Sequence, residues 1–435
     1  MDRDRILELD RQFVWRPYTS SEDHQTRDDL VLVGAEGARL IDADGTRYLD
    51  ATSSWWTCNL GYQHPRLIAA LVKQAKQLAH VAMAGATHAQ AALLAHRLVE
   101  LAPEGPRGER TLARVFFSDD GSTSVETALK MAFQYWAQNG RPERTRFLAL
   151  PGAYHGDTLG AMSVGALAEV GRVFRPLLLG INDAPQPKTP NEWEAAFDAL
   201  IAQLDDEADQ IAGVVVEPLV QGAAGMRMYD ASQLQRLREA CDRVDTFLIA
   251  DEVFTGIGRT GALWATEKAE VVPDLLCVAK GLSGGLLPFA ATLATQRIFD
   301  GFRGDGSRAL LHGHTFYGNP LGAAVALEVL RVVVDDAVLP QLAPKAEAIA
   351  RAFERMGAIP GATDPRALGM IGAIDLGHEG YLGRTGWKVH EEAKKRGVLL
   401  RPLGDTVYVV PPLTISDADL TTLLDTVEAS VRSVL

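Results

Sequence analysis

The stretch LLCVAKGLSGG, residues 275–285, joins a continuously apolar run to a lysine and three glycines. The run Leu275 to Ala279 predicts a strand covered by helices on both faces. Lys280 follows it directly, and lysine is rarely buried without a task. In a desolvated pocket its amine is a nucleophile suited to a Schiff base, so Lys280 is a candidate catalytic residue. The alternative is a lysine whose stem is buried and whose amine reaches solvent.

Similar apolar runs occur on either side of this stretch and alternate with helical patterns. They are residues 114–118, 146–150, 211–216, 246–250 and 288–294. This alternation predicts an α/β domain with a mostly parallel sheet over residues 61–335. Residues 336–435 change to helices mixed with short strands, and residues 1–60 contain strands of their own. We expect these two segments to form one smaller α+β domain.

Composition narrows the classes of function. The 435 residues carry 43 Lys and Arg against 56 Asp and Glu, a net charge of −13. An acidic surface argues against nucleic acid or an anionic membrane as the main partner. Cys58, Cys241 and Cys277 have neither a disulfide pattern nor a zinc spacing, so we expect no metal site and a cytoplasmic location. No apolar run reaches the ~18 residues of a membrane span.

The segment FSDDGSTS, residues 117–124, lies between a predicted strand and a predicted helix. Gly121 allows a close approach of the backbone, and the amides around Ser122 lie at a helix N-terminus, where the macrodipole favours an anion. The pattern predicts a phosphate site. Ordinary helix capping is the alternative, because Ser, Thr and Asp are preferred at that position.

Asp251 ends the apolar strand 246–250. A carboxylate at the carboxyl end of a central strand faces the crevice in which open α/β sheets bind ligands. There it can hold a proton on a ring nitrogen of a cofactor, and a helix N-cap is the alternative role. An imine-forming amine, a ring-nitrogen partner and a phosphate site are together what pyridoxal 5′-phosphate requires.

Several motifs are typical of one enzyme family. They are DEVFTGIGRTG at 251–261, Tyr154-His155-Gly156, Glu217-Pro218, Gln221-Gly222 and Lys280-Gly281. On these residues the chain resembles the fold-type I, class III aminotransferases over nearly its whole length. The resemblance implies a pyridoxal-phosphate transferase fold whose large domain has a mostly parallel, seven-stranded sheet.

The resemblance also implies roles for single residues. Lys280 would form the covalent link to the cofactor, and Asp251 would pair with its pyridine nitrogen. The other cofactor-binding residues would be Gly121, Ser122, Tyr154, Glu217, His314 and Thr315. Thr315 would reach the phosphate of the neighbouring subunit, which implies a homodimer with shared active sites.

Within the class, the chain is similar to the 7,8-diaminononanoate synthases of biotin biosynthesis, which act on 8-amino-7-oxononanoate. The similarity rests on WRPYT at 15–19, SSWW at 53–56 and RPLG at 401–404. It implies the substrate-binding residues Tyr18, Trp55, Tyr154, Arg259, Gly313, Arg401 and Tyr408, with Arg401 holding a carboxylate bidentately. Without the resemblance, adjacent tryptophans at 55 and 56 would be expected in the core.

The donor and the acceptor remain open at this point. His314 stands where the S-adenosylmethionine-using members commonly have proline, and LHGHT at 311–315 is similar to lysine-using relatives. Arg16 and Ile257 also depart from the pattern. A broad ω-amine or diamine aminotransferase is the second hypothesis. A silent binding protein is the third, and the joint presence of Lys280 and Asp251 with the phosphate-site residues argues against it.

Overall fold

The structure is a computed structural model that describes residues 2–105, 108, 111–165, 173–179, 185–377 and 380–435. Its largest sheet has the order β4-β11-β10-β9-β6-β5. The strands are β4 Leu112–Ser118, β5 Arg146–Ala149, β6 Ile211–Val216, β9 Phe247–Asp251, β10 Leu275–Val278 and β11 Ala290–Thr295. Strand β11 is antiparallel to both neighbours, and the other pairings are parallel. The predicted mostly parallel sheet is confirmed, and the described residues contribute six strands where seven were expected.

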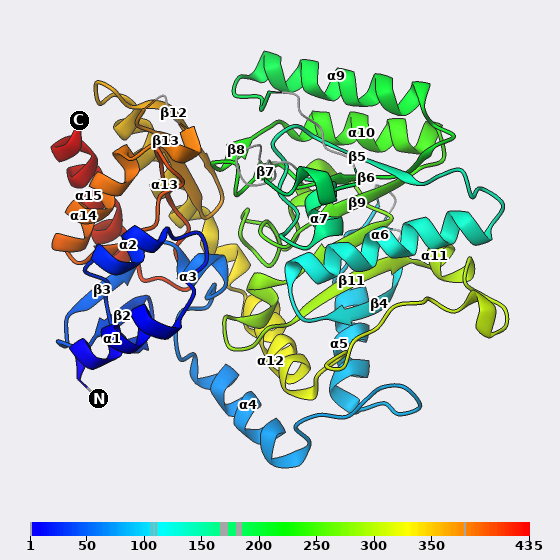
Figure 1. Ribbon diagram of the computed structural model, residues 1–435, viewed down its shortest axis with the longest axis horizontal. Helices are drawn as coiled ribbons and strands as arrows, with labels where there is room; N and C mark the ends of the chain where they lie inside the picture. Colours follow the sequence, from blue (N-terminus) through cyan, green and yellow to red (C-terminus); the bar gives the residue numbers. More distant parts are fainter. Residues whose placement is uncertain (1, 106–107, 109–110, 166–172, 180–184, 378–379) are drawn as a thin grey trace.

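Helices cover both faces of this sheet, which explains the continuous apolar runs. Phe247 and Ile249 of β9 pack in the same cluster as α6 (Gly121–Gln138). Leu248 points the other way and packs with α9 (Pro190–Asp206) and α10 (Ala231–Arg243). Figure 1 shows α9 and α10 beyond β5 and β6, away from α6.

The N-terminal and C-terminal segments lie together in the left-hand part of Figure 1, away from the large sheet. One sheet has the order β1-β2-β3-β14 and another β12-β13-β15. Leu49 of β3 pairs with Val398 of β14, so an N-terminal and a C-terminal strand are neighbours. The elements are β1 Leu32–Glu36, β2 Arg39–Asp42, β3 Arg47–Asp50, β12 Thr363–Leu368, β13 Ile371–Asp375, β14 Val398–Leu399, β15 Thr406–Val409, α13 Leu342–Gly357, α14 Thr385–Lys395 and α15 Asp417–Val434.

Further helices complete these two parts. They include α1 Arg3–Phe13, α2 Ser21–Thr26, α4 Pro65–Gln77, α5 Ala89–Glu100, α7 Leu159–Ser163 and α12 Pro320–Leu330. The sequence predicted a helix from 320 to 334, and α12 continues as a π-helical stretch, Arg331–Asp335. Among the described residues, no helix is both long and apolar enough to cross a membrane.

A left-handed turn follows β3. All four residues of α3 (Ser53–Trp56) have positive φ, between 48° and 76°. Such a backbone costs roughly 1–2 kcal/mol per non-glycine residue, so other contacts must hold it. A carboxylate oxygen of Asp50 accepts the amide of the second residue (2.6 Å), and the hydroxyl of the first donates to the Val410 carbonyl (2.7 Å). The turn leaves Trp55 41% exposed and Trp56 4% exposed.

Candidate active site

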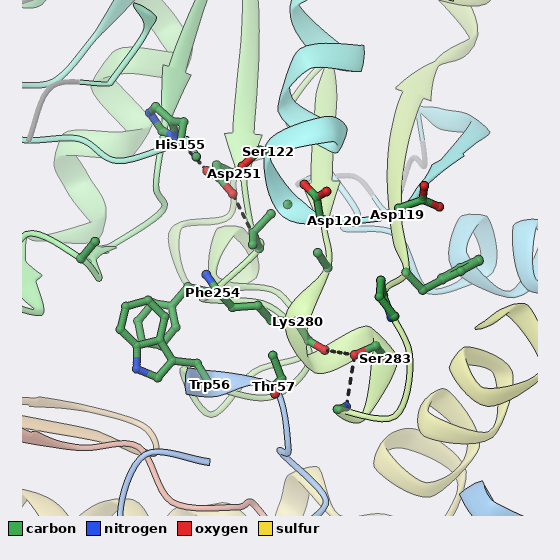
Figure 2. Close-up of a pocket in the computed structure, with 18 of the residues that line it drawn as sticks. Trp56, Thr57, Asp119, Asp120, Ser122, His155, Asp251, Phe254, Lys280 and Ser283 are labelled. Atoms are coloured by element: carbon green, nitrogen blue, oxygen red, sulfur yellow. Dashed lines mark hydrogen bonds and ion pairs between the residues drawn. The ribbon is translucent and has the colours of Figure 1, made fainter. Parts of the chain in front are cut away.

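The carboxyl ends of the parallel strands meet at one edge of the large sheet, where open α/β sheets bind ligands. A cavity of about 500 Å³ lies there (Figure 2). Six of the predicted site residues line it, namely Gly121, Ser122, Tyr154, Glu217, Asp251 and Lys280. They follow β4, β5, β6, β9 and β10, or end one of them, so the parallel topology brings them together.

Lys280 begins a short 3₁₀ helix directly after β10, and its side chain extends into the cavity (Figure 2). Its Nζ lies 4.7 Å from the centroid of the Trp56 ring. Burial lowers the pKa of the Lys280 amine, and the carboxylates of Asp251 and Glu217 oppose that change. A lowered pKa increases the neutral fraction of the amine, the form that attacks a carbonyl or removes a proton.

Asp251 is fixed through both of its carboxylate oxygens. Oδ2 lies 2.8 Å from Nδ1 of His155, and Oδ1 accepts the amide of Val253 at 3.0 Å (Figure 2). A turn follows Asp251 rather than a helix, so the N-cap alternative is wrong. The result is a buried carboxylate held in one orientation at the cavity wall.

The first two residues of α6, Gly121 and Ser122, line the cavity, so the N-terminus of this helix faces it. Asp120 is the N-cap and accepts the amide of Thr123 at 2.9 Å, so capping is also present. The amides that precede Thr123 point outward by the geometry of any helix start. A Cβ at position 121 would lie 2.6 Å from Val253, so the close approach requires glycine.

Glu217 lines the cavity and contacts the backbone of Tyr154. Its carboxylate accepts the amides of Tyr154 (3.0 Å) and Gly222 (2.9 Å), which ties two loops together. Burial raises the pKa of Glu217 to about 7; His155 opposes this rise and Asp251 adds to it. Gln221, which the resemblance also placed in the pocket, is not among the lining residues and donates to the Pro151 carbonyl.

Three predicted substrate residues form a group of their own. The rings of Tyr18 and Trp55 meet edge to face at 6.0 Å. The guanidinium of Arg401 lies 4.7 Å from the centroid of Trp55. Tyr18 donates to Asp157, and burial together with Tyr18 and Asp157 raises the pKa of Tyr154. This group is therefore linked to the cavity through Tyr154.

A comparison with known protein families identifies the chain. A family model described as Aminotransferase class-III matches residues 19–431 of the chain. The chain belongs to the class III aminotransferases. Among curated relatives of this aminotransferase, the adenosylmethionine-8-amino-7-oxononanoate aminotransferase of Geobacter sulfurreducens is 39% identical and covers 100% of this chain and 98% of its own. The enzyme of the same name from Synechococcus elongatus is 43% identical, and the match covers 94% of this chain and 95% of that enzyme.

Solved structures agree with this assignment. The enzyme of that name from Methanocaldococcus jannaschii has a TM-score of 0.93 and 33% identity, covering 99% of both chains. An amine transaminase from an uncultivated Pseudomonas species, in its PLP-bound form, has a TM-score of 0.87 and 34% identity. The match covers 97% of this chain and 98% of the transaminase. The fold-type I architecture expected for a class III aminotransferase is thus confirmed.

The residues of this aminotransferase fit pyridoxal phosphate, the cofactor of its class. The cavity combines a lysine amine, a fixed buried carboxylate and a helix N-terminus. A Cβ at Gly156 would lie 2.1 Å from the Ser122 hydroxyl, so the close approach of these two segments also requires glycine. In the part of the chain that the structure describes, no group of three or more His, Cys, Asp or Glu side chains could hold a metal ion.

Arg259 and Tyr408 of the aminotransferase lie behind the cavity wall. Arg259 is 2% exposed, and Nη1 donates to the Pro411 carbonyl at 2.6 Å. Its Nη2 is buried without a hydrogen-bond partner, and burial lowers the pKa of Arg259 to about 9 while Asp50 opposes the change. Tyr408 is 1% exposed, and its hydroxyl accepts Nε1 of Trp56 at 3.2 Å. Neither residue lines the cavity of this single chain.

The segment from Gly313 to Thr315 is also not part of the cavity lining. Gly313 and Thr315 are exposed. Nδ1 of His314 lies 3.2 Å from the carboxylate of Asp119, which does line the cavity. Within one chain, His314 therefore reaches the rim and Thr315 does not.

Three residues of the site lacked an assigned role from sequence alone. His155 was seen, but no pattern shows that it meets Asp251. Asp157 carries a carboxylate three residues after Tyr154, a weak signal. Trp56 was expected in the core, which is correct, but it also lines the cavity. For Trp55 the core alternative is wrong.

Proposed function

We propose that this aminotransferase transfers an amino group to 8-amino-7-oxononanoate and forms 7,8-diaminononanoate in biotin biosynthesis. The observation that carries the proposal is full-length similarity, at 33–43% identity, to several enzymes with this activity in their names. S-adenosylmethionine, which those names include, is the proposed donor. Lysine is the second candidate, supported by His314 in place of the usual proline.

Different residues of the chain have different proposed roles at the cofactor. When bound, pyridoxal phosphate supplies the aldehyde that accepts the amino group and a ring that takes up electrons. Lys280 would hold the cofactor covalently, and its free amine would act as the base that moves a proton between carbon atoms. Asp251, fixed by His155, keeps the ring nitrogen protonated. The amides of Gly121 and Ser122, with the Ser122 hydroxyl, bind the phosphate.

The substrate site extends outward from this cavity, from Tyr154 in the lining to Tyr18, Trp55 and Arg401. Arg401 holds a carboxylate, because its planar guanidinium binds such groups bidentately. The tryptophan and tyrosine rings exclude water along an aliphatic chain. The resemblance implies Arg259, Gly313 and Tyr408 as further substrate residues, although none of the three lines the cavity of one chain. The unpartnered Nη2 of Arg259 supports a second anion contact.

The active unit proposed is a homodimer in which Thr315 of one subunit binds the phosphate of the other, and His314 is a further proposed cofactor-binding residue. Three features of this segment support it: Thr315 is exposed, does not line its own cavity, and has the exposed apolar residues Leu311 and Phe316 beside it. Such a shared site is incomplete in one copy.

We also propose that residues 61–335 form the large cofactor-binding domain, with 1–60 and 336–435 as the small domain. An apolar cluster that joins Leu49 and Ala51 to residues between 342 and 431 supports the grouping. The cytoplasm is the proposed compartment, and three free buried cysteines support it.

Half-reaction assays test the proposal. Purified protein with pyridoxal phosphate is offered S-adenosylmethionine, lysine or a simple amine, and 8-amino-7-oxononanoate follows. Formation of 7,8-diaminononanoate is the expected result. Conversion of simple amines without conversion of this keto acid would favour the second candidate, an ω-amine transaminase, which the similarity to the Pseudomonas enzyme supports.

A further inference from the structure

The amine of Lys280 lies against an aromatic face. Its Nζ is 4.7 Å from the centroid of Trp56 (Figure 2). The indole is held in turn, because its ring packs 4.5 Å from that of Phe254 and its Nε1 donates to the Tyr408 hydroxyl. The ring is therefore held by packing against Phe254 and by a hydrogen bond along its polar edge.

The backbone that carries the Trp56 ring is strained. Trp56 is the last of four consecutive left-handed residues, with φ of 76°. Strain of this kind persists only where surrounding contacts enforce it, and it gathers at functional sites. Here Asp50 and Val410 hold the turn. A tryptophan needed only as core filler would not require a left-handed backbone.

Among the described residues, the charged groups that act on the Lys280 amine are Asp251 and Glu217. Glu217 is itself a weak charge near neutral pH, because burial raises its pKa to about 7. An amine that carries a proton between two carbons is cationic for part of each cycle, in a cavity where burial disfavours the charge. A tryptophan face stabilises a desolvated ammonium more strongly than any other side-chain ring.

We propose that Trp56 is a positioning residue for Lys280, whose indole face holds the amine and stabilises its protonated form whenever the amine is not bonded to the cofactor. The inference rests on the proposed role of Lys280 as the transferring base. It goes beyond that role by naming the group that keeps the released amine in the cavity. A purely structural Trp56 would leave the pKa of Lys280 unchanged.

Competitive labelling of Lys280 with acetic anhydride tests this directly. The full chain carries pyridoxamine 5′-phosphate, which leaves the lysine amine free, and the labelled peptide is quantified by mass spectrometry from pH 6 to 11. Trp56→Leu should lower the labelling pKa of Lys280 by about one unit, and Trp56→Phe by less, because phenylalanine keeps a weaker aromatic face. Trp193→Phe is the matched control, since Trp193 is equally buried but packs with Phe197 and Tyr229.

The outcomes separate the alternatives. An unchanged or raised pKa in Trp56→Phe and Trp56→Leu overturns the inference, even if both variants are less stable. Should Trp56→Leu fail to fold, Trp56→Phe alone decides. The visible band that wild-type protein forms with pyridoxal phosphate is measured separately: its absence refutes the proposed role of Lys280, whereas an unaltered band with an unaltered pKa refutes only the role of Trp56.

Discussion

The imidazole of His155 meets the carboxylate of Asp251 at 2.8 Å, with side chains that are 0% and 5% exposed. The other oxygen of Asp251 is occupied by the amide of Val253. Asp251 therefore cannot rotate without breaking two hydrogen bonds in a buried site. A carboxylate fixed in this way is already oriented for the ring nitrogen of a cofactor, so no reorganisation is needed when charge develops.

Asp251→Asn tests this orientation. The amide cannot hold a proton on the ring nitrogen as a charge partner, so kcat should fall by about 10²–10⁴-fold, the usual range for a lost positioned proton partner. Steady-state kinetics at saturating pyridoxal phosphate measure it. A near-normal kcat in a variant with normal cofactor content would reject the role of Asp251.

Lys280→Ala should abolish turnover and the visible absorbance of the bound cofactor, because the nucleophile and base are removed together. Spectral titration with pyridoxal phosphate and an activity assay check both. Lys268→Ala, at an exposed lysine, is the control and should behave as wild type. Turnover by Lys280→Ala comparable to the control would end the proposed mechanism.

Gly121→Ala should weaken cofactor binding, because its Cβ would lie 2.6 Å from Val253 and displace the start of α6. Overpacking of this kind costs about 1–3 kcal/mol. Equilibrium titration gives the change in Kd. Gly34→Ala is the comparison, since its Cβ meets only Ile41 at 3.8 Å, and equal affinities in the two variants would contradict the prediction.

Glu217 should make stability depend on pH. Its pKa is about 7 in the folded chain against 4.5 as the ordinary value, so the folded state binds the extra proton between these two pH values. The stabilisation is complete below pH 4.5 and is lost as the pH rises through 7, a change of about 3 kcal/mol. Glu217→Gln lacks this change.

Denaturant unfolding of cofactor-free protein at pH 5 and pH 8 measures it. The free energy of unfolding of Glu217→Gln should rise relative to wild type between the two pH values. Burial also raises the pKa of Glu252 to about 7. Because Glu252 is present in both proteins, its contribution to the pH dependence cancels in the difference between them. A difference between the proteins that stays constant with pH would show that Glu217 titrates normally.

Arg401→Ala should raise the KM for the keto acid by about 10–100-fold, the value of one charge-assisted hydrogen bond, and leave the Kd for pyridoxal phosphate unchanged. Arg396→Ala, which removes a surface pair with Glu392, is the matched control. If both variants keep the wild-type KM, the carboxylate is bound elsewhere.

The parts of the fold and site that follow from local patterns were predictable. Continuous apolar runs identified the central strands, and the residue after each run led to Lys280 and Asp251. The contact between His155 and Asp251 was not predictable, because no local rule brings residues 96 positions apart together. The left-handed turn at Trp55 and Trp56 was equally hidden, since non-glycine residues adopt it only under the long-range contacts of Asp50 and Val410.

The pairing of Leu49 with Val398 has a consequence for biosynthesis. Strand β3 leaves the ribosome long before β14 exists, so its hydrogen-bonding edge stays open while most of the chain is translated. The described strands of the central sheet end at Thr295, so all of them are translated before β14. The nascent N-terminal segment gains this pairing only when the last part of the polypeptide is made, and until then its unpaired edge is exposed to aggregation and to capture by chaperones.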